Sequence, residues 1–478
     1  MDMDITEQFL QFEMDLGLFS RTYCGEHYWH LIRFNLFEQI KAEKTHKKPF
    51  SNTIRATAKI KVLLRISFCA IAQLLNPKLR DADILLHYQD IYRNIDGLLT
   101  NVFLDPLMNQ FCTQPVYIDP DFRAPFDRRY PNSSTGVMRF LLYRTLSAIF
   151  RTHVDKKEDL FLESLERKIN EEFHVSVFSL AYTVRRISLY CQAFSIYVKK
   201  LLFKVKPKVV LTSCHYSTRI FVLIKEARKM GIPVIELQHG MFGSKHISYN
   251  FLDKVGGKLY FPDYILTYGQ YSSDKMRLPF GAKAIKTGFV YMEMRMKKLQ
   301  DIKRQDKLIV FYSSFEECLI SVLIASISLA RKYGYELICK LHPGEAAHWR
   351  EYYPSLANAD IEVIDAPIDI YELFLRGKHH VGVVSTTLYE AIGTGGFVHT
   401  HVSAESYMHD MLEAGAARQF STADELMNNI LEIDRSFDSP DNSRIAAQLF
   451  EPNALENQID AIQNIVKGSA NENSLHCI

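Results

Sequence analysis

The sequence has few of the features that mark membrane-spanning, disulfide-bonded or nucleic-acid-binding proteins. Its eight cysteines form no C-x-x-C pair, which is typical of reduced thiols rather than of a disulfide framework or a zinc site. No stretch reaches about 18 uninterrupted apolar residues, and the acidic start MDMDITEQFLQFEMDLG does not resemble a signal peptide. The net charge of +2 argues against a dedicated nucleic-acid binder. We therefore expect a soluble, cytoplasmic protein, either free or at the inner face of the cytoplasmic membrane.

What the sequence does contain is an alternation of short β-branched segments with longer helical patterns, as in parallel sheets covered by helices. The clearest unit runs from the strand KVVLTS, through a helix with Ser217 as N-cap and Gly231 at its end, to the strand IPVIELQ. An earlier unit has strands at DILLHY and PVYID, with a helix predicted over DGLLTNVFLDPLMNQF (96–111). Since 478 residues exceed one ordinary core, we predict an α/β protein with two Rossmann-like domains, an interdomain cleft and extra N-terminal helices.

The expected domain boundaries follow from a charged segment after Val290, YMEMRMKKLQDIKRQDK, which has no core periodicity. A second series of strands then begins with LIVFYSS, ELICKLHP and HVGVVSTT, and Thr422 with Glu425 predicts a capping box. This gives an N-terminal domain at 1–290, a linker at 291–306, a C-terminal domain at 307–440, and closing helices with a tail at 441–478.

Two helical segments, 137–151 (VMRFLLYRTLSAIFR) and 194–208 (FSIYVKKLLFKVKPK), combine basic and apolar residues. They are either packed helices with Lys and Arg outward, or a face that contacts an anionic membrane or an acidic acceptor.

Ligands of open parallel sheets bind beyond the carboxyl ends of the strands, so polar residues that directly follow a strand are candidates for a site. In VIELQHGMFGSKH (234–246), His239 follows a buried strand, with Gln238, Gly240 and Lys245 beside it. An imidazole at this point is suited to removing a proton from a hydroxyl nucleophile. It is equally suited to a structural hydrogen bond at the strand end, and position alone does not decide between the two.

Three later strands end in residues suited to binding phosphate. In KLHPGE, Lys340 and a histidine held by proline precede a predicted helix, and in VVSTTLYEA hydroxyls lie at a strand-to-helix junction. A carboxylate one turn into that helix could accept hydrogen bonds from the ribose hydroxyls of a nucleotide. Alternatively, the hydroxyl side chains of the VVSTTLYEA motif only cap the helix. No G-x-G-x-x-G follows a strand, so a dinucleotide fingerprint is absent. The donor-side candidates are Lys340, His342, Pro343, Ser385, Thr386, Thr387, Glu390, Ser313 and Ser314.

The motifs LQHG, KLHP and STTLYEA on two Rossmann-like domains resemble those of GT-B glycosyltransferases of bacterial surface polysaccharide (capsule and O-antigen) synthesis, over about 208–435. The similar families are sialyl-, polysialyl- and Kdo transferases, and teichoic-acid glycerophosphotransferases share the arrangement. The resemblance implies a donor bound by His342 and by Ser385 to Thr387, and His239 as the base. Sialyltransferases instead use an acidic base, for which Asp90 and Asp96 are the nearest candidates.

The activity implied by the resemblance is metal-independent, inverting transfer of a sugar from a nucleotide-sugar donor to a hydroxyl of a surface glycan or lipid-linked acceptor. A CMP-linked acidic sugar is favoured as the donor. This arrangement does not require a metal, and we expect neither a metal nor a cofactor. The alternatives are a CDP-polyol phosphotransferase, a sugar-nucleotide epimerase on the same fold, and a non-catalytic scaffold in polysaccharide assembly.

Overall fold

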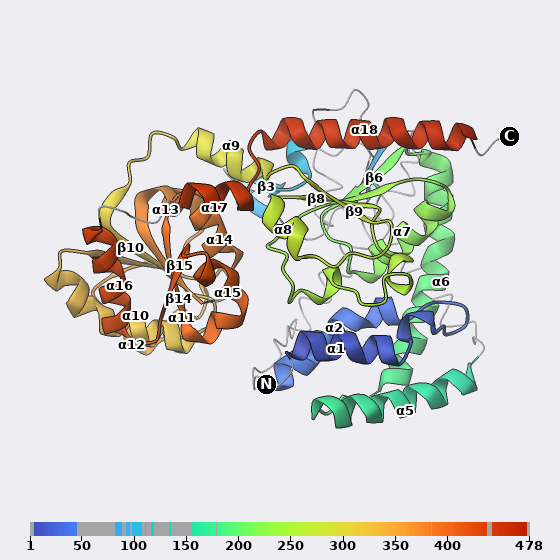
Figure 1. The fold of residues 1–478 in the computed structure, drawn as a ribbon, viewed down its shortest axis with the longest axis horizontal. Helices are drawn as coiled ribbons and strands as arrows, with labels where there is room; N and C mark the ends of the chain where they lie inside the picture. The colour runs from blue at the N-terminus through green and yellow to red at the C-terminus, as the bar shows by residue number, and fades with distance from the viewer. Residues whose placement is uncertain are drawn as a thin grey trace.

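The computed structural model contains two parallel β-sheets, each covered by helices, in two side-by-side bodies (Figure 1). It describes residues 4–44, 82–87, 92–95, 98–107, 110, 116–118, 133–134, 154–177, 179–383, 385–436 and 442–475. The predicted fold class, α/β with two Rossmann-like domains, is confirmed by the strand order of the two sheets.

The first sheet has seven strands in the order β5-β4-β1-β6-β7-β8-β9, and every neighbouring pair is parallel. Its central strands are apolar and fully buried because helices cover both faces. The strands are β1 (Ile84–His87), β4 (Val116–Ile118), β5 (Ser133–Ser134), β6 (Val209–Thr212), β7 (Val234–Leu237), β8 (Tyr264–Thr267) and β9 (Lys283–Lys286). The strand predictions at DILLHY, PVYID, KVVLTS and IPVIELQ are confirmed.

The predicted helix over 96–111 is wrong. Where this part of the chain is described, β2 (Tyr92–Ile95) pairs antiparallel with β3 (Leu98–Asn101), and a short 3₁₀ helix follows at Asp105–Leu107. The Asn101 side chain accepts from the backbone N–H groups of Phe103 and Leu104 at 3.1 and 3.0 Å, which stabilises a turn instead of a helix.

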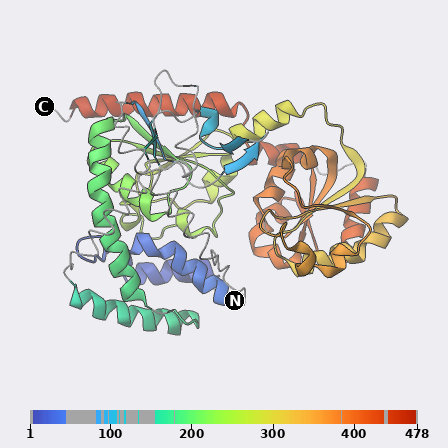
Figure 2. The same ribbon diagram turned by 180° about the vertical axis from the view of Figure 1, so that it is seen from behind.

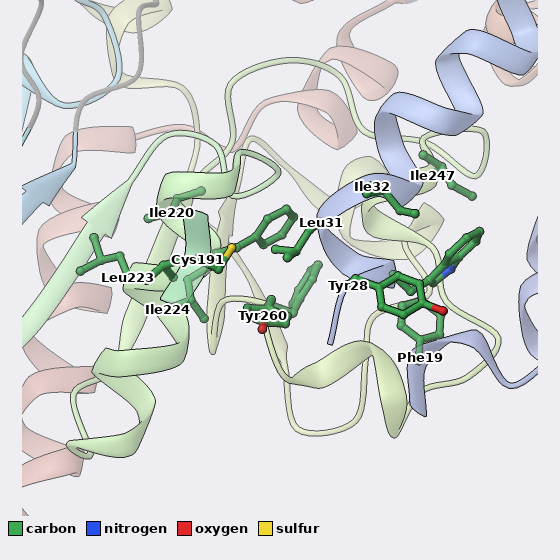
Figure 3. Packing of buried hydrophobic residues seen from close by; sticks show 14 of the residues in the cluster. Phe19, Tyr28, Leu31, Ile32, Cys191, Ile220, Leu223, Ile224, Ile247 and Tyr260 are labelled. Carbon is green, nitrogen blue, oxygen red and sulfur yellow. The ribbon is translucent and has the colours of Figure 1, made fainter. Parts of the chain in front are cut away.

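Helices added before the sheet pack against it through one large apolar cluster (Figure 3). The described helices of this body are α1 (Ile5–Asp15), α2 (Trp29–Lys44), α5 (Lys156–Phe173), α6 (Leu180–Val205), α7 (Thr218–Lys229), α8 (Gln270–Lys275) and α9 (Val290–Lys298). The extra N-terminal helices are therefore present. Figure 3 shows Leu31 and Ile32 of α2 near Tyr260, and Cys191 of α6 beside Ile224 of α7.

The segment 194–208 lies mostly in α6, and its apolar side chains divide between the core and the surface. Phe194, Tyr197 and Leu201 are buried, as expected for a packed helix, whereas Phe203 is 74% exposed among lysines. The segment 137–151 lies outside the described residues. In the described part of the chain, no helix is both long enough and apolar enough to cross a membrane.

The second sheet has six parallel strands in the order β12-β11-β10-β13-β14-β15. The strands are β10 (Gln305–Tyr312), β11 (Glu336–Lys340), β12 (Glu362–Ile364), β13 (Gly377–Gly382), β14 (Phe397–His401) and β15 (Ala417–Phe420). The helices are α10 (Glu317–Lys332), α11 (Trp349–Tyr352), α12 (Pro354–Ala357), α13 (Ile370–Arg376), α14 (Thr386–Gly393), α15 (Glu405–Glu413) and α16 (Ala423–Arg435). Thr422 caps α16 as predicted, and Glu425 reaches back to Ser421.

The chain returns to the first body through α17 (Asn442–Leu449) and α18 (Ala454–Leu475). Figures 1 and 2 both show α18 lying along the first body, away from the second sheet. The backbone N–H of Glu451 donates to Tyr268 O at 2.7 Å, so the crossing segment is fixed to the end of β8. Two connections thus join the bodies, and they lie on the same side of the molecule: the chain leaves the first body through α9 and returns to it through α17 (Figure 1).

Candidate functional site

The predicted base, His239, lies directly beyond β7 with a side chain that is 11% exposed. Its Nε2 atom is 2.8 Å from the Tyr216 hydroxyl, and its Nδ1 atom is 3.6 Å from Oε1 of Glu236. Burial lowers the pKa of His239 to about 4, although the Glu236 carboxylate opposes that shift. The ring is therefore neutral near pH 7; its Nε2 faces the Tyr216 hydroxyl, and its Nδ1 lies beside the Glu236 carboxylate at a distance too long for a hydrogen bond.

Glu236 is the charged centre of this cluster, although it belongs to the buried strand β7 and has no exposed surface. Its carboxylate accepts from Nδ1 of His215 at 2.7 Å and from the Tyr249 hydroxyl at 2.6 Å. Burial alone would raise the pKa of Glu236, but His215, His239 and Tyr249 lower it, so the group stays ionised. A buried carboxylate with two histidines around it could orient a general base and stabilise its protonated form.

The acceptor-side candidates around His239 have different environments. Gln238 is buried, donates to Gly240 O at 2.6 Å and to Ser272 Oγ at 2.8 Å, and accepts from Tyr268 N at 2.6 Å, so its amide holds the loop. Lys245 is partly exposed and forms an ion pair with Asp4 at 2.6 Å, which ties the loop to the start of α1.

Gly240 brings the first body against the second. A Cβ atom built on Gly240 would lie 3.4 Å from Cγ2 of Thr386, the first residue of α14. The loop that follows β7 and the motif that follows β13 are therefore in direct apposition, although about 146 residues separate them in the sequence.

A cavity of about 380 Å³ lies beside this contact and is lined from both bodies, which confirms the interdomain cleft. One wall comes from α2 and the loop 241–247, and includes Lys41 and His246; the other comes from α14 and α15, and includes Thr386 and Tyr389. Its mixture of aromatic, cationic and carboxylate side chains is suited to a polar ligand with flat apolar faces, such as a sugar.

The Ser-Thr motif forms the amino terminus of α14. The Ser385 hydroxyl caps the helix by accepting from Thr387 N at 3.1 Å, as ordinary capping requires, and both Ser385 and Thr386 line the cavity. The structure thus places the positive end of a helix and two hydroxyls at the cleft. Thr387 is partly buried, one residue further along.

Glu390 lies one turn further into α14 but is buried, and it accepts a hydrogen bond from the Tyr371 hydroxyl. The side chain faces the interior of the second body rather than the cavity lining. A direct contact between Glu390 and a ribose would require the Glu390 side chain to become exposed at the cleft.

The KLHPGE motif follows β11, and SS of YSSFEE follows β10, so both lie on the same edge of the sheet as Ser385. His342 and Pro343 are exposed, Lys340 donates to Leu341 O at 2.7 Å, and Ser314 is partly buried. Burial lowers the pKa of Lys340. None of these residues is among those that line the described cavity, so a donor that touched them would extend along the sheet edge.

Glu345 joins these two loops and was missed as a site residue. Its fully buried carboxylate accepts from Ser313 Oγ at 2.9 Å, Phe315 N at 2.8 Å, His342 N at 2.9 Å and the Tyr353 hydroxyl at 2.5 Å. The position of Glu345 directly after His-Pro-Gly was the only available signal. Glu236 had a similar signal, since it is the one charged residue in an otherwise apolar strand.

Two candidates cannot be placed, because Asp90 and Asp96 lie outside the described residues. Among the residues that the structure does describe, no group of three or more His, Cys, Asp or Glu side chains is arranged to hold a metal ion.

No protein-family model matches this sequence, and no curated protein matches it either. Among solved structures, UDP-GlcNAc 2-epimerase from Neisseria meningitidis bound to UDP-GlcNAc is similar, with 12% identity and a TM-score of 0.48 over 80% of this chain and 99% of that chain. The wall teichoic acid polymerase TagF with CDPG shows 10% identity and a TM-score of 0.43 over 91% of this chain and 98% of that chain. UDP-N-acetylglucosamine 2-epimerase from Rickettsia bellii shows 14% identity and a TM-score of 0.44, over 80% and 95%. These similarities concern the fold.

Proposed function

We propose that this protein is a glycosyltransferase that moves a sugar from a nucleotide-activated donor to a hydroxyl of a glycan or lipid-linked acceptor. The observation that carries the proposal is the apposition of the His239 loop and the amino terminus of α14 across one cavity. A proton acceptor on one body and an anion-binding helix end on the other are the two parts that such a transfer needs. A CMP-linked acidic sugar remains the favoured donor on the basis of the sequence motifs.

On the donor side, the phosphate oxygens would be held at Ser385 and Thr386 by their hydroxyls and by the positive end of the α14 dipole. The same groups stabilise the negative charge that develops on the phosphate as the bond to the sugar breaks. His342 and Lys340, two strands along the same edge, would contact the rest of the nucleotide, and Glu345 would keep their loop in place.

On the acceptor side, the acceptor oxygen would attack the anomeric carbon of the donor sugar while its proton passes to Nε2 of His239. Because the Tyr216 hydroxyl lies within hydrogen-bond distance of Nε2, the acceptor hydroxyl would either displace the Tyr216 hydroxyl or pass its proton to Nε2 through that hydroxyl. Glu236, 3.6 Å from Nδ1, would stabilise the imidazolium that results. Its role is to position and charge-stabilise His239, not to contact the substrate.

Nucleotide binding is tested by the melting temperature in the presence of CMP, CDP, UDP and GDP, since a ligand that binds only the folded state stabilises it. We expect one of the four to raise the melting temperature, and Thr386→Val to reduce that rise. If none of the four changes it, the proposal fails.

Catalysis is tested with His239→Ala, which should reduce turnover by about 100-fold or more while nucleotide binding changes little. His174→Asn, at an exposed histidine that ends α5, is the matched control and should retain full activity. Loss of nucleotide binding in His239→Ala would move this residue to the donor side. Product analysis separates the alternatives, because an epimerase releases a product without any acceptor and a polyol phosphotransferase leaves the phosphate in the product.

A further inference from the structure

Away from the cleft, two loop tips of the first body expose large apolar side chains side by side. Val255 is 81% exposed and Phe280, just before β9, is 72% exposed. The backbone N–H of Phe280 donates to Lys254 O at 2.8 Å, which holds the two tips together. Such exposure of two large apolar side chains at adjacent tips is unfavourable in water unless a partner covers them.

The tips are held rigidly from below. His30 Nε2 lies 2.9 Å from Gly256 O, and Asp253 Oδ1 accepts from Gly256 N at 2.7 Å. Arg228, near the end of α7, donates to the carbonyl oxygens of Lys258 and Leu259 at 2.6 and 2.9 Å. The exposed side chains therefore project from a fixed base, and Met230, next to Arg228, adds a third apolar side chain that is 42% exposed.

Most of the exposed charged side chains around these apolar side chains are lysines. The Lys258 ammonium lies 5.8 Å from the centre of the Phe280 ring, and Lys254 and Lys283 are exposed nearby in the chain. Lys229, exposed at the end of α7, forms an ion pair with Glu226 at 3.4 Å. Within the described residues, no carboxylate forms an ion pair with Lys254, Lys258 or Lys283. Of the neighbouring carboxylates, Asp263 pairs with Arg228 at 2.8 Å, and Asp253 accepts from the backbone N–H of Gly256 at 2.7 Å.

We propose that this surface docks on an anionic lipid bilayer. We call it the Val255–Phe280 surface, and it consists of Lys229, Met230, Lys254, Val255, Lys258, Phe280 and Lys283. Protruding apolar side chains insert between lipid headgroups while lysines contact the headgroup phosphates. A protein partner fits less well, because lysine is depleted at protein interfaces and three separated apolar side chains do not form a continuous interface core.

Docking by this surface would not block the proposed active site. The surface precedes β8 and β9, whereas the cleft is built where strands end, so the cavity beside Thr386 would stay open to its ligands. The inference does not depend on the proposed function, since membrane binding is measured without donor or acceptor.

The test is co-sedimentation of the full chain with phosphatidylcholine vesicles, with and without about 30% phosphatidylserine. We expect binding only to the anionic vesicles, and weaker binding at high salt. The double variant Val255→Ser/Phe280→Ser should bind at least about tenfold more weakly, because two apolar side chains no longer insert. Replacing Lys254, Lys258 and Lys283 with Gln should weaken binding by roughly 100-fold, at about fivefold per lysine.

The matched controls lie on α5, where Leu160 is 68% exposed beside the exposed residues Lys156, Lys157 and Lys168. Leu160→Ser and the Lys→Gln triple at these positions should bind like the wild type. All variants should keep the wild-type melting temperature, since the changed side chains are on the surface. The proposal is overturned if the wild type does not distinguish anionic from neutral vesicles, or if the variants bind equally well. It is also overturned if Val255→Ser/Phe280→Ser abolishes a dimer seen by sedimentation velocity, which would assign the surface to a second copy of the chain.

Discussion

Replacing Arg33 with methionine should destabilise the first body and disturb the wall of the cleft. Arg33 lies in α2 with a side chain that is 4% exposed, and its guanidinium forms a two-pronged ion pair with Glu13, at 3.0 and 2.6 Å. It also donates to the carbonyl oxygens of Ile247 and Asn250 at 2.8 and 3.2 Å. These two carbonyls end the loop that begins at His239, so one side chain connects the N-terminal helices to the site.

The size of the expected loss in the free energy of unfolding follows from the groups that lose their partner in Arg33→Met. The Glu13 carboxylate, which has no exposed surface, would keep only the Trp29 indole N–H at 2.9 Å as a described side-chain donor. Breaking a buried ion pair by removing one partner costs about 3–5 kcal/mol. Burial already raises the pKa of Glu13 despite Arg33, so removing Arg33 should raise this pKa further. The double variant Glu13→Leu/Arg33→Met removes the unpaired charge and should be more stable than Arg33→Met alone.

Urea unfolding followed by tryptophan fluorescence measures this change. The chain has two tryptophans, Trp29 near Glu13 and Trp349 in the second body, so a Trp349→Phe background reports on the first body alone. Arg331→Met, which breaks the exposed pair with Asp360, is the control and should cost about 1 kcal/mol or less. A loss of less than about 1 kcal/mol for Arg33→Met, or a double variant less stable than Arg33→Met, would refute the reasoning.

Two further predictions concern the pH dependence of stability and the segment in which the chain returns to the first body. Burial lowers the pKa of His239 to about 4 and of His30 and His380 to about 3, so each stays neutral in the folded state while the unfolded chain protonates below about pH 6.5. The contribution of these neutral histidines to the free energy of unfolding is fully present above that pH. It should fall by about 1.4 kcal/mol per histidine between pH 7.5 and 5.5, as measured by urea unfolding. Equal free energies of unfolding at the two pH values would contradict this prediction. Gly288→Ala should destabilise the protein by about 2 kcal/mol or more in the same assay, because Gly288 has a φ of +93° and a new Cβ would lie 2.2 Å from Glu451 O. Gly334→Ala, also at positive φ but in open space, is the control and should cost less.

Much of the fold could be predicted because its signals are local. The strands that become β6 and β7 are mostly apolar segments, interrupted only by Thr212 and Glu236, and Gly231 ends α7 with a φ of +69°. The prediction failed at 96–111, where the helical apolar spacing was overridden by the turn that the Asn101 side chain stabilises. A short side chain that bonds nearby backbone competes with a helix in a way that apolar periodicity does not register.

For the site, the sequence alone determined which strand ends carry His239, His342 and Ser385, because an alternation of strands and helices fixes which residues lie at the carboxyl edge of each sheet. Only the tertiary structure decided that Gly240 meets Thr386, and that Glu236 lies between His215 and His239. Contacts between residues far apart in the chain depend on how the two bodies pack and on which polar groups become buried together. Neither depends on local pattern, so the donor and acceptor motifs could be found in the sequence but not placed face to face.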